Sequence, residues 1–124
     1  MKLSVADLIA NKDAIKAGKG KTAAVFVSSL AGEITVKGID ADTFTEAFGM
    51  EDAYAADKHV VYRCVVAPDL KNSELQKTFN CVAPDDIVDA LFLPGEVSKV
   101  AAACLALSGY AQDSVKLVDS AKNE

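Results

Sequence analysis

A chain of 124 residues fits a single domain, and its 51% hydrophobic and 25% charged residues are typical of a globular rather than a disordered protein. The formal net charge of −5 argues against a nucleic-acid-binding protein, which needs a basic face, and against binding to an anionic membrane. No apolar run approaches the roughly 20 residues that span a bilayer, and the first residues lack a secretion signal, so we expect the protein to remain in the cytoplasm.

The first forty residues predict a helix and a β-hairpin. Ser4 and Asp7 have the spacing of a capping box, which favours a helix that carries Lys12 and Lys16 toward its end and stops at Gly18. The apolar residues on one face of this helix include Val5, Leu8 and Ile9. Residues 22–28 are rich in β-branched side chains and 33–37 alternate polar with apolar, so we expect two strands joined by residues 29–32.

The middle of the chain predicts short helices. Asp42 is placed to cap a helix over 43–48, and a longer helix is expected over about 51–66, ended by Pro68. A short helix should start at residue 72 or 73 and run through 79. Pro84 suits the first turn of the next helix, whose core face would carry Ile87, Val88, Leu91 and Phe92.

The last long helix has signals at both ends. Pro94 suits its first turn, and Glu96 favours the positive end of its dipole. Gly109 can adopt the left-handed geometry of a C-cap, after which Tyr110 should lie back on Leu105. The predicted core face consists of Val97, Val100, Ala101, Cys104 and Leu105.

These elements predict a mainly α (α+β) fold, a helical domain with an N-terminal β-hairpin. Residues 1–110 should form one domain, and 111–124 a polar, partly mobile tail with one weak apolar stripe. Four phenylalanines are expected to serve the core rather than a contact surface: Phe44, Phe48, Phe79 and Phe92.

The motifs that suggest chemistry have simpler interpretations. Residues 20–22, Gly-Lys-Thr, match the end of a phosphate-binding loop, but Ile15 stands where its first glycine belongs and the segment runs from helix into strand. Cys64, Cys81 and Cys104 are too few and too far apart for a disulfide framework or zinc site, and each has apolar neighbours typical of a reduced core cysteine.

The titratable residues also lack the pattern of an active site. His59, the only histidine, is expected at the surface, and its spacing from Cys64 disfavours a catalytic pair. Asp85, Asp86 and Asp89 form an acidic turn that could attract a hard cation, although helix-start electrostatics explains it better. We therefore predict no catalytic, cofactor-binding or metal-binding residues and no enzymatic activity.

Three segments in the C-terminal half, in the same order and at compatible spacing, resemble the XkdN-like phage tail assembly chaperone family. The segment 62–76 is similar to the family's aliphatic-x-Pro-Asp/Asn-Leu-x-x-x-Glu-Leu-Gln stretch, 91–96 to its Leu-Leu-Pro-Gly-Glu segment, and 107–110 to its Leu-Ser/Asn-Gly-aromatic ending. The central residues of these motifs read as helix stops, starts and turns that specify the fold: Pro68, Asp69, Leu70, Pro94, Gly95, Glu96, Ser108, Gly109 and Tyr110.

The resemblance implies a protein of the host cell cytoplasm that coats the helices of the tape measure protein, helps to recruit the tail tube protein, and can form a homo-oligomer. Candidate partner-binding residues are Leu8, Ile9 and Ile15 on the first helix and any exposed part of Phe92 and Leu93. In many relatives a ribosomal frameshift yields a longer form, and residues 121–123 are compatible with a slippery run in the gene.

Two other functions remain open. The chain could be a small acidic regulator or adaptor that captures a basic partner, although acids and lysines are mixed along it. It could also be a small enzyme, which would require a pocket that joins His59 to Cys64 or to an aspartate.

Overall fold

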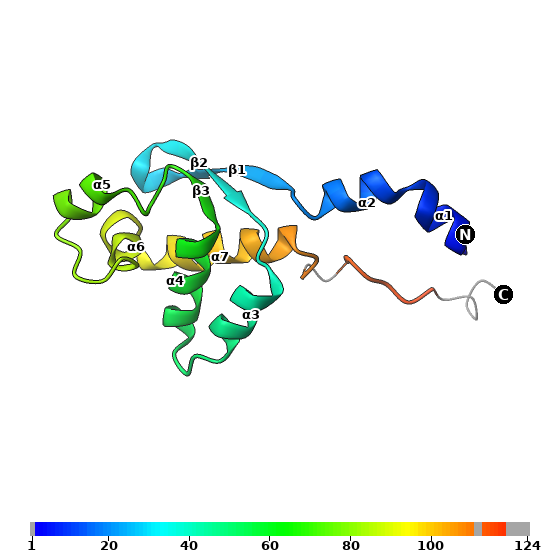
Figure 1. Ribbon diagram of the computed structural model, residues 1–124. Helices are drawn as coiled ribbons and strands as arrows, with labels where there is room; N and C mark the ends of the chain where they lie inside the picture. The colour runs from blue at the N-terminus through cyan, green and yellow to red at the C-terminus, as the bar shows by residue number, and fades with distance from the viewer. Residues whose placement is uncertain (1, 111–112, 119–124) are drawn as a thin grey trace.

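A computed structural model describes residues 2–110 and 113–118, where helices outnumber strands around a three-stranded antiparallel sheet of order β1-β2-β3. The long helix α7 packs against the sheet and against α4, and α4 also contacts α3 and α6 (Figure 1). The mixed architecture is as predicted, with one strand more than expected. The helices are α1 (Val5–Ala10), α2 (Lys12–Gly18), α3 (Ala41–Phe48), α4 (Ala53–Cys64), α5 (Ser73–Thr78), α6 (Asp86–Leu91) and α7 (Pro94–Leu107); the strands are β1 (Thr22–Val27), β2 (Gly32–Lys37) and β3 (Val65–Ala67).

The N-terminal hairpin is present, with Thr22 opposite Lys37 and Val27 opposite Gly32. A single 3-10 turn over Ser28–Leu30 joins the two strands. In β2, Ile34 and Val36 are buried and their neighbours are more exposed, so the predicted alternation is confirmed.

The third strand replaces the end of a predicted helix. The helix expected over 51–66 begins at Ala53 and ends at Cys64, and β3 then pairs with β2. The prediction was wrong at this end because two β-branched valines are followed by a residue that precedes Pro68, and the proline ring pushes that residue toward extended geometry.

The predicted first helix is divided into α1 and α2. Its capping box is confirmed: the backbone N–H of Asp7 donates to Ser4 Oγ (3.1 Å), and the Ser4 N–H donates to Asp7 Oδ2 (2.9 Å). Asn11 interrupts the helix, since its side-chain amide donates to the Asp7 carbonyl (2.9 Å) and its own backbone leaves helical geometry.

Two predicted helix starts need correction, and a third is confirmed. The N–H of Thr43 donates to Asp40 Oδ1 (2.7 Å), so Asp40 caps α3, and Asp42 lies inside its first turn. Pro84 precedes α6 and does not form its first turn. The start of α5 at Ser73 is as predicted, and Asn72 caps it by accepting the N–H of Leu75 (2.9 Å).

The core contains the predicted face of α7, with Val97, Val100, Ala101 and Cys104 all buried. Two of the four phenylalanines do not belong to it: Phe48 is 65% exposed and Phe79 is 43% exposed. On α3 the buried positions are Thr43 and Ala47, and the residue after Ala47 is turned by about 100° around the helix, which brings Phe48 to the rim.

The described part of the tail, residues 113–118, lies outside any helix or strand. Its three apolar side chains, Val115, Leu117 and Val118, are almost fully exposed, so the expected stripe does not pack on the domain. The predicted frameshift site at residues 121–123 lies outside the described residues. Within the described ranges, no helix has the length and apolar character needed to cross a membrane.

Candidate functional site

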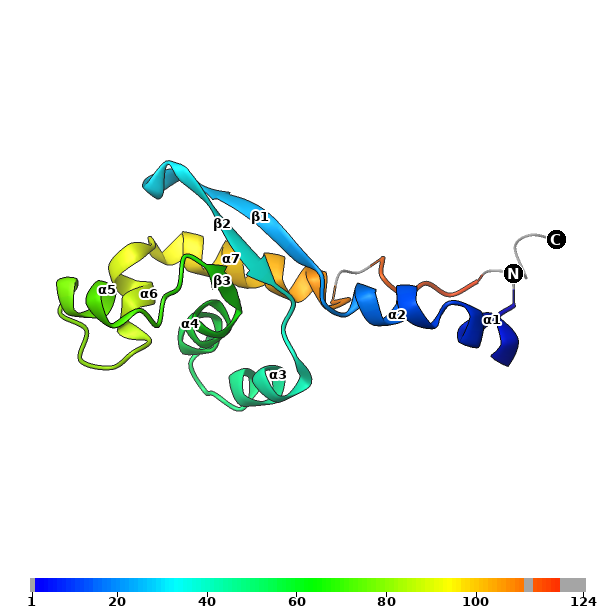
Figure 2. The ribbon, with the colours of Figure 1, turned by 45° about the horizontal axis from the view of Figure 1, so that its top comes forward.

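The helices α1 and α2 form an arm that runs outward from the start of β1 and lies clear of the sheet and of α3–α7 in two views (Figures 1 and 2). None of its residues is buried. The three partner-binding residues predicted on this segment are exposed, with fractions of 48% for Leu8, 70% for Ile9 and 43% for Ile15. Leaving such side chains in water is costly, so the arm is suited to docking.

The arm presents an apolar stripe with basic margins. Its residues line a shallow hollow of about 360 Å³, formed by Val5, Leu8, Ile9, Lys12, Ile15 and Lys16 and called here the arm stripe. Among the described residues, neither lysine takes part in an ion pair. A complementary surface would therefore be apolar with acidic margins.

The fold places the two residues of the other predicted contact, Phe92 and Leu93, in different environments. Phe92 is 4% exposed and belongs to the core, so it is unavailable to a partner and its prediction as a contact is corrected. Leu93, directly before the first turn of α7, is 60% exposed and is the exposed part of this pair.

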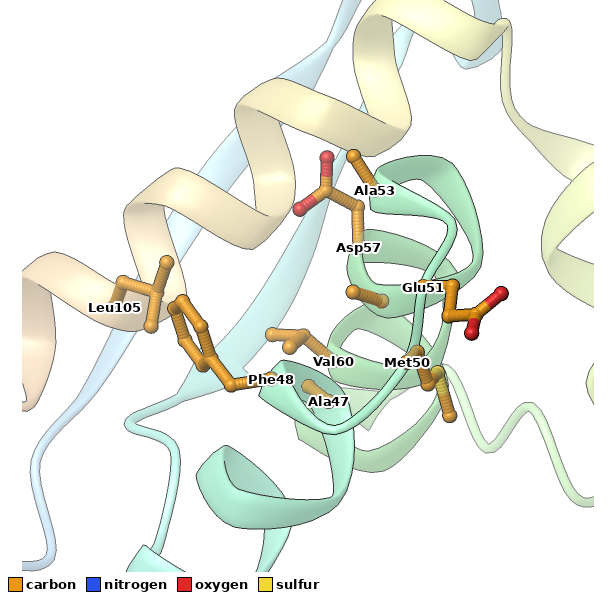
Figure 3. A pocket seen from close by; sticks show the side chains of 9 residues that line it. Ala47, Phe48, Met50, Glu51, Ala53, Asp57, Val60 and Leu105 are labelled. Atoms are coloured by element: carbon orange, nitrogen blue, oxygen red, sulfur yellow. The ribbon is translucent and has the colours of Figure 1, made fainter.

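A second apolar hollow lies between the α3–α4 connection and α7. Its volume is about 270 Å³, and its lining, called here the α3–α4–α7 groove, consists of Ala47, Phe48, Met50, Glu51, Ala53, Ala56, Asp57, Val60 and Leu105. Figure 3 shows the Phe48 ring lying toward Leu105 of α7, while Asp57 extends from α4 toward α7. The ring of Phe44 supports Phe48, with centroids 4.1 Å apart.

The groove carries two carboxylates. Partial burial raises the pKa of Asp57 above its ordinary value. Glu51 lies at the exposed rim. In the residues that the structure describes, neither carboxylate has an ion-pair partner. A ligand with an apolar body and positive charges would fit this lining best.

The proline-glycine-glutamate motif at the start of α7 fastens the hairpin tip. The N–H of Leu93 donates to Glu96 Oε1 (2.9 Å), and Ser29 donates its hydroxyl to the same oxygen (2.6 Å) and its N–H to Oε2 (3.2 Å). These bonds hold the pKa of Glu96 below its usual value. Gly95 has open space where a side chain would stand, so packing does not require glycine there.

The serine-glycine-tyrosine motif closes the other end of α7. The N–H of Tyr110 donates to the Leu105 carbonyl (3.1 Å), the long bond of the predicted Schellman ending, and Gly109 has a φ of +87°. The tyrosine ring stacks on Phe44, with centroids 4.6 Å apart. Ser108 Oγ donates to the Ile39 carbonyl (2.8 Å) and ties α7 to the segment after β2.

The proline-aspartate-leucine motif forms a turn with an apolar plug. Asp69 Oδ1 accepts the N–H of Lys71 (3.0 Å), while Leu70 is 2% exposed and sits in the core. Gln76 from the same segment donates to the carbonyls of Leu70 and Pro84, both at 3.0 Å. These contacts join α5 to the loop before α6.

The acidic turn near α6 is bound by a lysine. Lys58 Nζ lies 2.6 Å from Asp89 Oδ2 and 3.5 Å from Asp86 Oδ1, and the Tyr54 hydroxyl also donates to Asp89. These interactions lower the pKa of Asp89. Within the described ranges, no group of three potential metal ligands is found. Part of the negative charge that a basic partner would need is therefore already neutralised.

His59 and the three cysteines line neither the arm stripe nor the α3–α4–α7 groove. His59 Nε2 is 3.0 Å from Glu46 Oε1, and its side chain is 20% exposed, so the histidine lies partly buried at the surface, paired with a carboxylate. Cys64 and Cys104 are buried and Cys81 is partly buried, all as free thiols. The neighbouring thiol of Cys64, together with burial, raises the pKa of Cys104.

The sequence pattern found the arm but not the groove. The signal available for the groove was a pair of large apolar residues, Phe48 and Met50, on either side of Gly49. From the sequence alone, large apolar residues of this kind are assigned to the core. Helical spacing shows which residues share a face of α3, but not whether another element covers that face.

The comparisons agree with the resemblance noted from the sequence. The family model described as Phage XkdN-like tail assembly chaperone protein, TAC, matches residues 11–122. Searches of curated proteins and of solved structures found no match to this chain.

Proposed function

The chain belongs to the XkdN-like phage tail assembly chaperone family, and we propose that it binds the tape measure protein and helps to recruit tail tube subunits. The proposal places the protein in the host cell cytoplasm, as a binding protein rather than an enzyme. The observation that carries it is the arm stripe, whose apolar side chains are exposed on helices that lie clear of the domain.

Docking through this arm suits a long helical client. An amphipathic helix can lay its apolar face along another helix, and each copy of the chaperone would cover only a short length of it. Each contact is then small and weak, but many copies along one client retain it through their combined binding. The exposed Leu93 adds a second apolar point on the domain itself.

The net charge of −5 supports the same role. A client coated with acidic domains is repelled from other coated clients, which keeps apolar helices in solution. The recruitment of tail tube subunits is proposed from the family alone, and no residue is assigned to it.

Co-expression with the tape measure protein from the same phage tests this function. We expect the client to become soluble and to co-elute with the chaperone. The triple variant Leu8→Ser, Ile9→Ser, Ile15→Ser should lose the complex, because each buried aliphatic side chain is worth about tenfold or more in affinity. Val82→Ser is the matched control, since Val82 is 97% exposed and lies far from the arm in the sequence.

The outcome that contradicts the proposal is equally direct. If the client is no more soluble with the chaperone than without it, and no complex elutes, the protein does not act on the tape measure. If Val82→Ser weakens the complex as much as the triple variant does, the arm is not the contact.

A further inference from the structure

We propose that the arm stripe of one copy docks into the α3–α4–α7 groove of a second copy, so that the protein assembles head to tail. This goes beyond client binding and does not depend on the client. It rests on two surfaces of one chain that match in polarity and in charge.

The first step is the match of apolar surface. The groove has a volume of about 270 Å³ and is lined mostly by apolar side chains. Large aliphatic side chains stand exposed along the arm over residues 5–15. Helices α1 and α2 together extend roughly 20 Å, so two or three of these side chains can enter the groove at once.

The second step is the match of charge. The arm stripe contains Lys12 and Lys16, whereas the groove contains Glu51 and Asp57. Asp57 is partly buried among apolar groups, and in the described residues it has no ion-pair partner. A lysine that approached it on a docked arm would supply the missing countercharge in a desolvated place, where such pairs matter most.

The third step concerns which copy supplies the arm. In both views the arm leads away from the body and lies clear of α3 and α4, so it does not occupy its own groove (Figures 1 and 2). Each copy therefore presents one arm and one groove on different surfaces. Contacts of this heterologous kind produce rings or open chains rather than closed twofold dimers.

Self-docking would also cover apolar surface before a client is present. The arm stripe and the groove are both exposed hydrophobic surfaces, which in a free protein invite aggregation. A copy that is docked on its neighbour hides both of them. The proposed client contact uses the same stripe, so client and neighbour would compete for it; this last point rests on the proposed function.

Sedimentation velocity of the full chain alone, over a range of concentrations, tests the proposal through charge reversal. The arm variant Lys12→Glu, Lys16→Glu and the groove variant Glu51→Lys, Asp57→Lys should each associate at least about tenfold more weakly than the parent chain, because attraction becomes repulsion at two positions. An equimolar mixture of the two should regain association, since each variant's arm then faces an oppositely charged groove.

A chain that carries all four reversals should also associate with itself, because its acidic arm faces a basic groove. The control Lys77→Glu, Lys99→Glu reverses two exposed lysines that line neither surface and should behave like the parent. Circular dichroism checks the fold of the groove variants. If the groove variants unfold, the arm variant still tests the proposal, because Lys12 and Lys16 are exposed and outside the core.

The proposal is overturned if the parent chain is a monomer at all concentrations, as it would be if the arm folded back on its own groove. It is overturned equally if the arm variant associates as strongly as the parent, or if the mixture of folded variants stays monomeric. None of these results bears on the co-elution test with the tape measure, so the two proposals fail separately.

Discussion

Glu96, in the first turn of α7, holds Ser29 at the tip of the β1–β2 hairpin. The serine donates both its hydroxyl (2.6 Å) and its N–H (3.2 Å) to the carboxylate, across 67 positions of sequence. The same carboxylate also accepts the N–H of Leu93 at the start of its own helix. One side chain therefore fixes a helix end and the position of a distant turn.

This relationship predicts a coupling between the two side chains. Ser29→Ala and Glu96→Ala should each lower the free energy of unfolding in urea, and the double variant should lose less than the sum, because the second change removes a bond that is already broken. Glu96→Ala should cost more than Ser29→Ala, since it also frees the Leu93 N–H. Strict additivity in the cycle would show that the bond contributes nothing.

The end of α7 predicts a rescue. A side chain at Gly38 would place its Cβ in collision with Ser108 Oγ, so Gly38→Ala must drive that hydroxyl out of its bond to the Ile39 carbonyl. We expect a loss of about 1 kcal/mol in stability, the usual value of one such bond. In a Ser108→Ala background the same change should cost nothing, because the remaining neighbours lie at 3.5 Å.

Chemical denaturation of the parent chain, of the Gly38→Ala and Ser108→Ala variants and of the double variant measures this rescue. Gly38→Ala should shift the midpoint only when Ser108 is present. An equal penalty in both backgrounds would place the strain in the backbone rather than at the hydroxyl.

The cluster of Asp89, Lys58 and Tyr54 predicts a pH dependence. Hydrogen bonds from Lys58 and Tyr54 hold the pKa of Asp89 below 3.8 in the folded chain. A folded pKa below the unfolded one adds stability above about pH 4, and that stability is lost as the pH falls through the folded value. Asp89→Asn should therefore cost about 0.5–1 kcal/mol at neutral pH, a value reduced by solvent screening at a carboxylate that is 44% exposed.

Urea unfolding of parent and variant between about pH 7 and pH 2 provides the measurement. The difference between them should shrink only in the acidic part of this range. Asp113→Asn, at an exposed position of the tail, should show no difference at any pH. A penalty for Asp89→Asn that is the same at every pH would mean that packing, not charge, accounts for it.

Local signals explain the parts of the fold that the sequence predicts well. The signals at helix ends each act within one helical turn, so the geometry they favour hardly depends on the rest of the chain. They are Ser4 with Asp7, Pro94, and Gly109 with Tyr110. The alternation along β2 is similarly local. These signals place most of the helices, the hairpin and the exposed apolar arm.

The features that the sequence does not predict depend on distant partners. The valines and Pro68 favour an extended backbone over the three residues of β3, but only the pairing with β2 makes this short segment a strand. Glu96 reads locally as a charge at a helix start, and nothing nearby indicates its bond to Ser29. Phe48 reads as core because no local pattern reveals that α3 leaves this face uncovered.

The three thiols predict unequal reactivity. Cys81 is partly exposed. Cys64, the last residue of α4, and Cys104, within α7, are both buried. The raised pKa of Cys104 keeps it in the unreactive thiol form, since only the thiolate attacks a disulfide reagent. In the native protein an aromatic disulfide reagent should therefore modify one cysteine rapidly, and all three only in denaturant. Mass spectrometry should find the rapid label on Cys81, and Cys81→Ser should abolish that phase; rapid labelling of Cys104 would mean that α7 opens readily from the core.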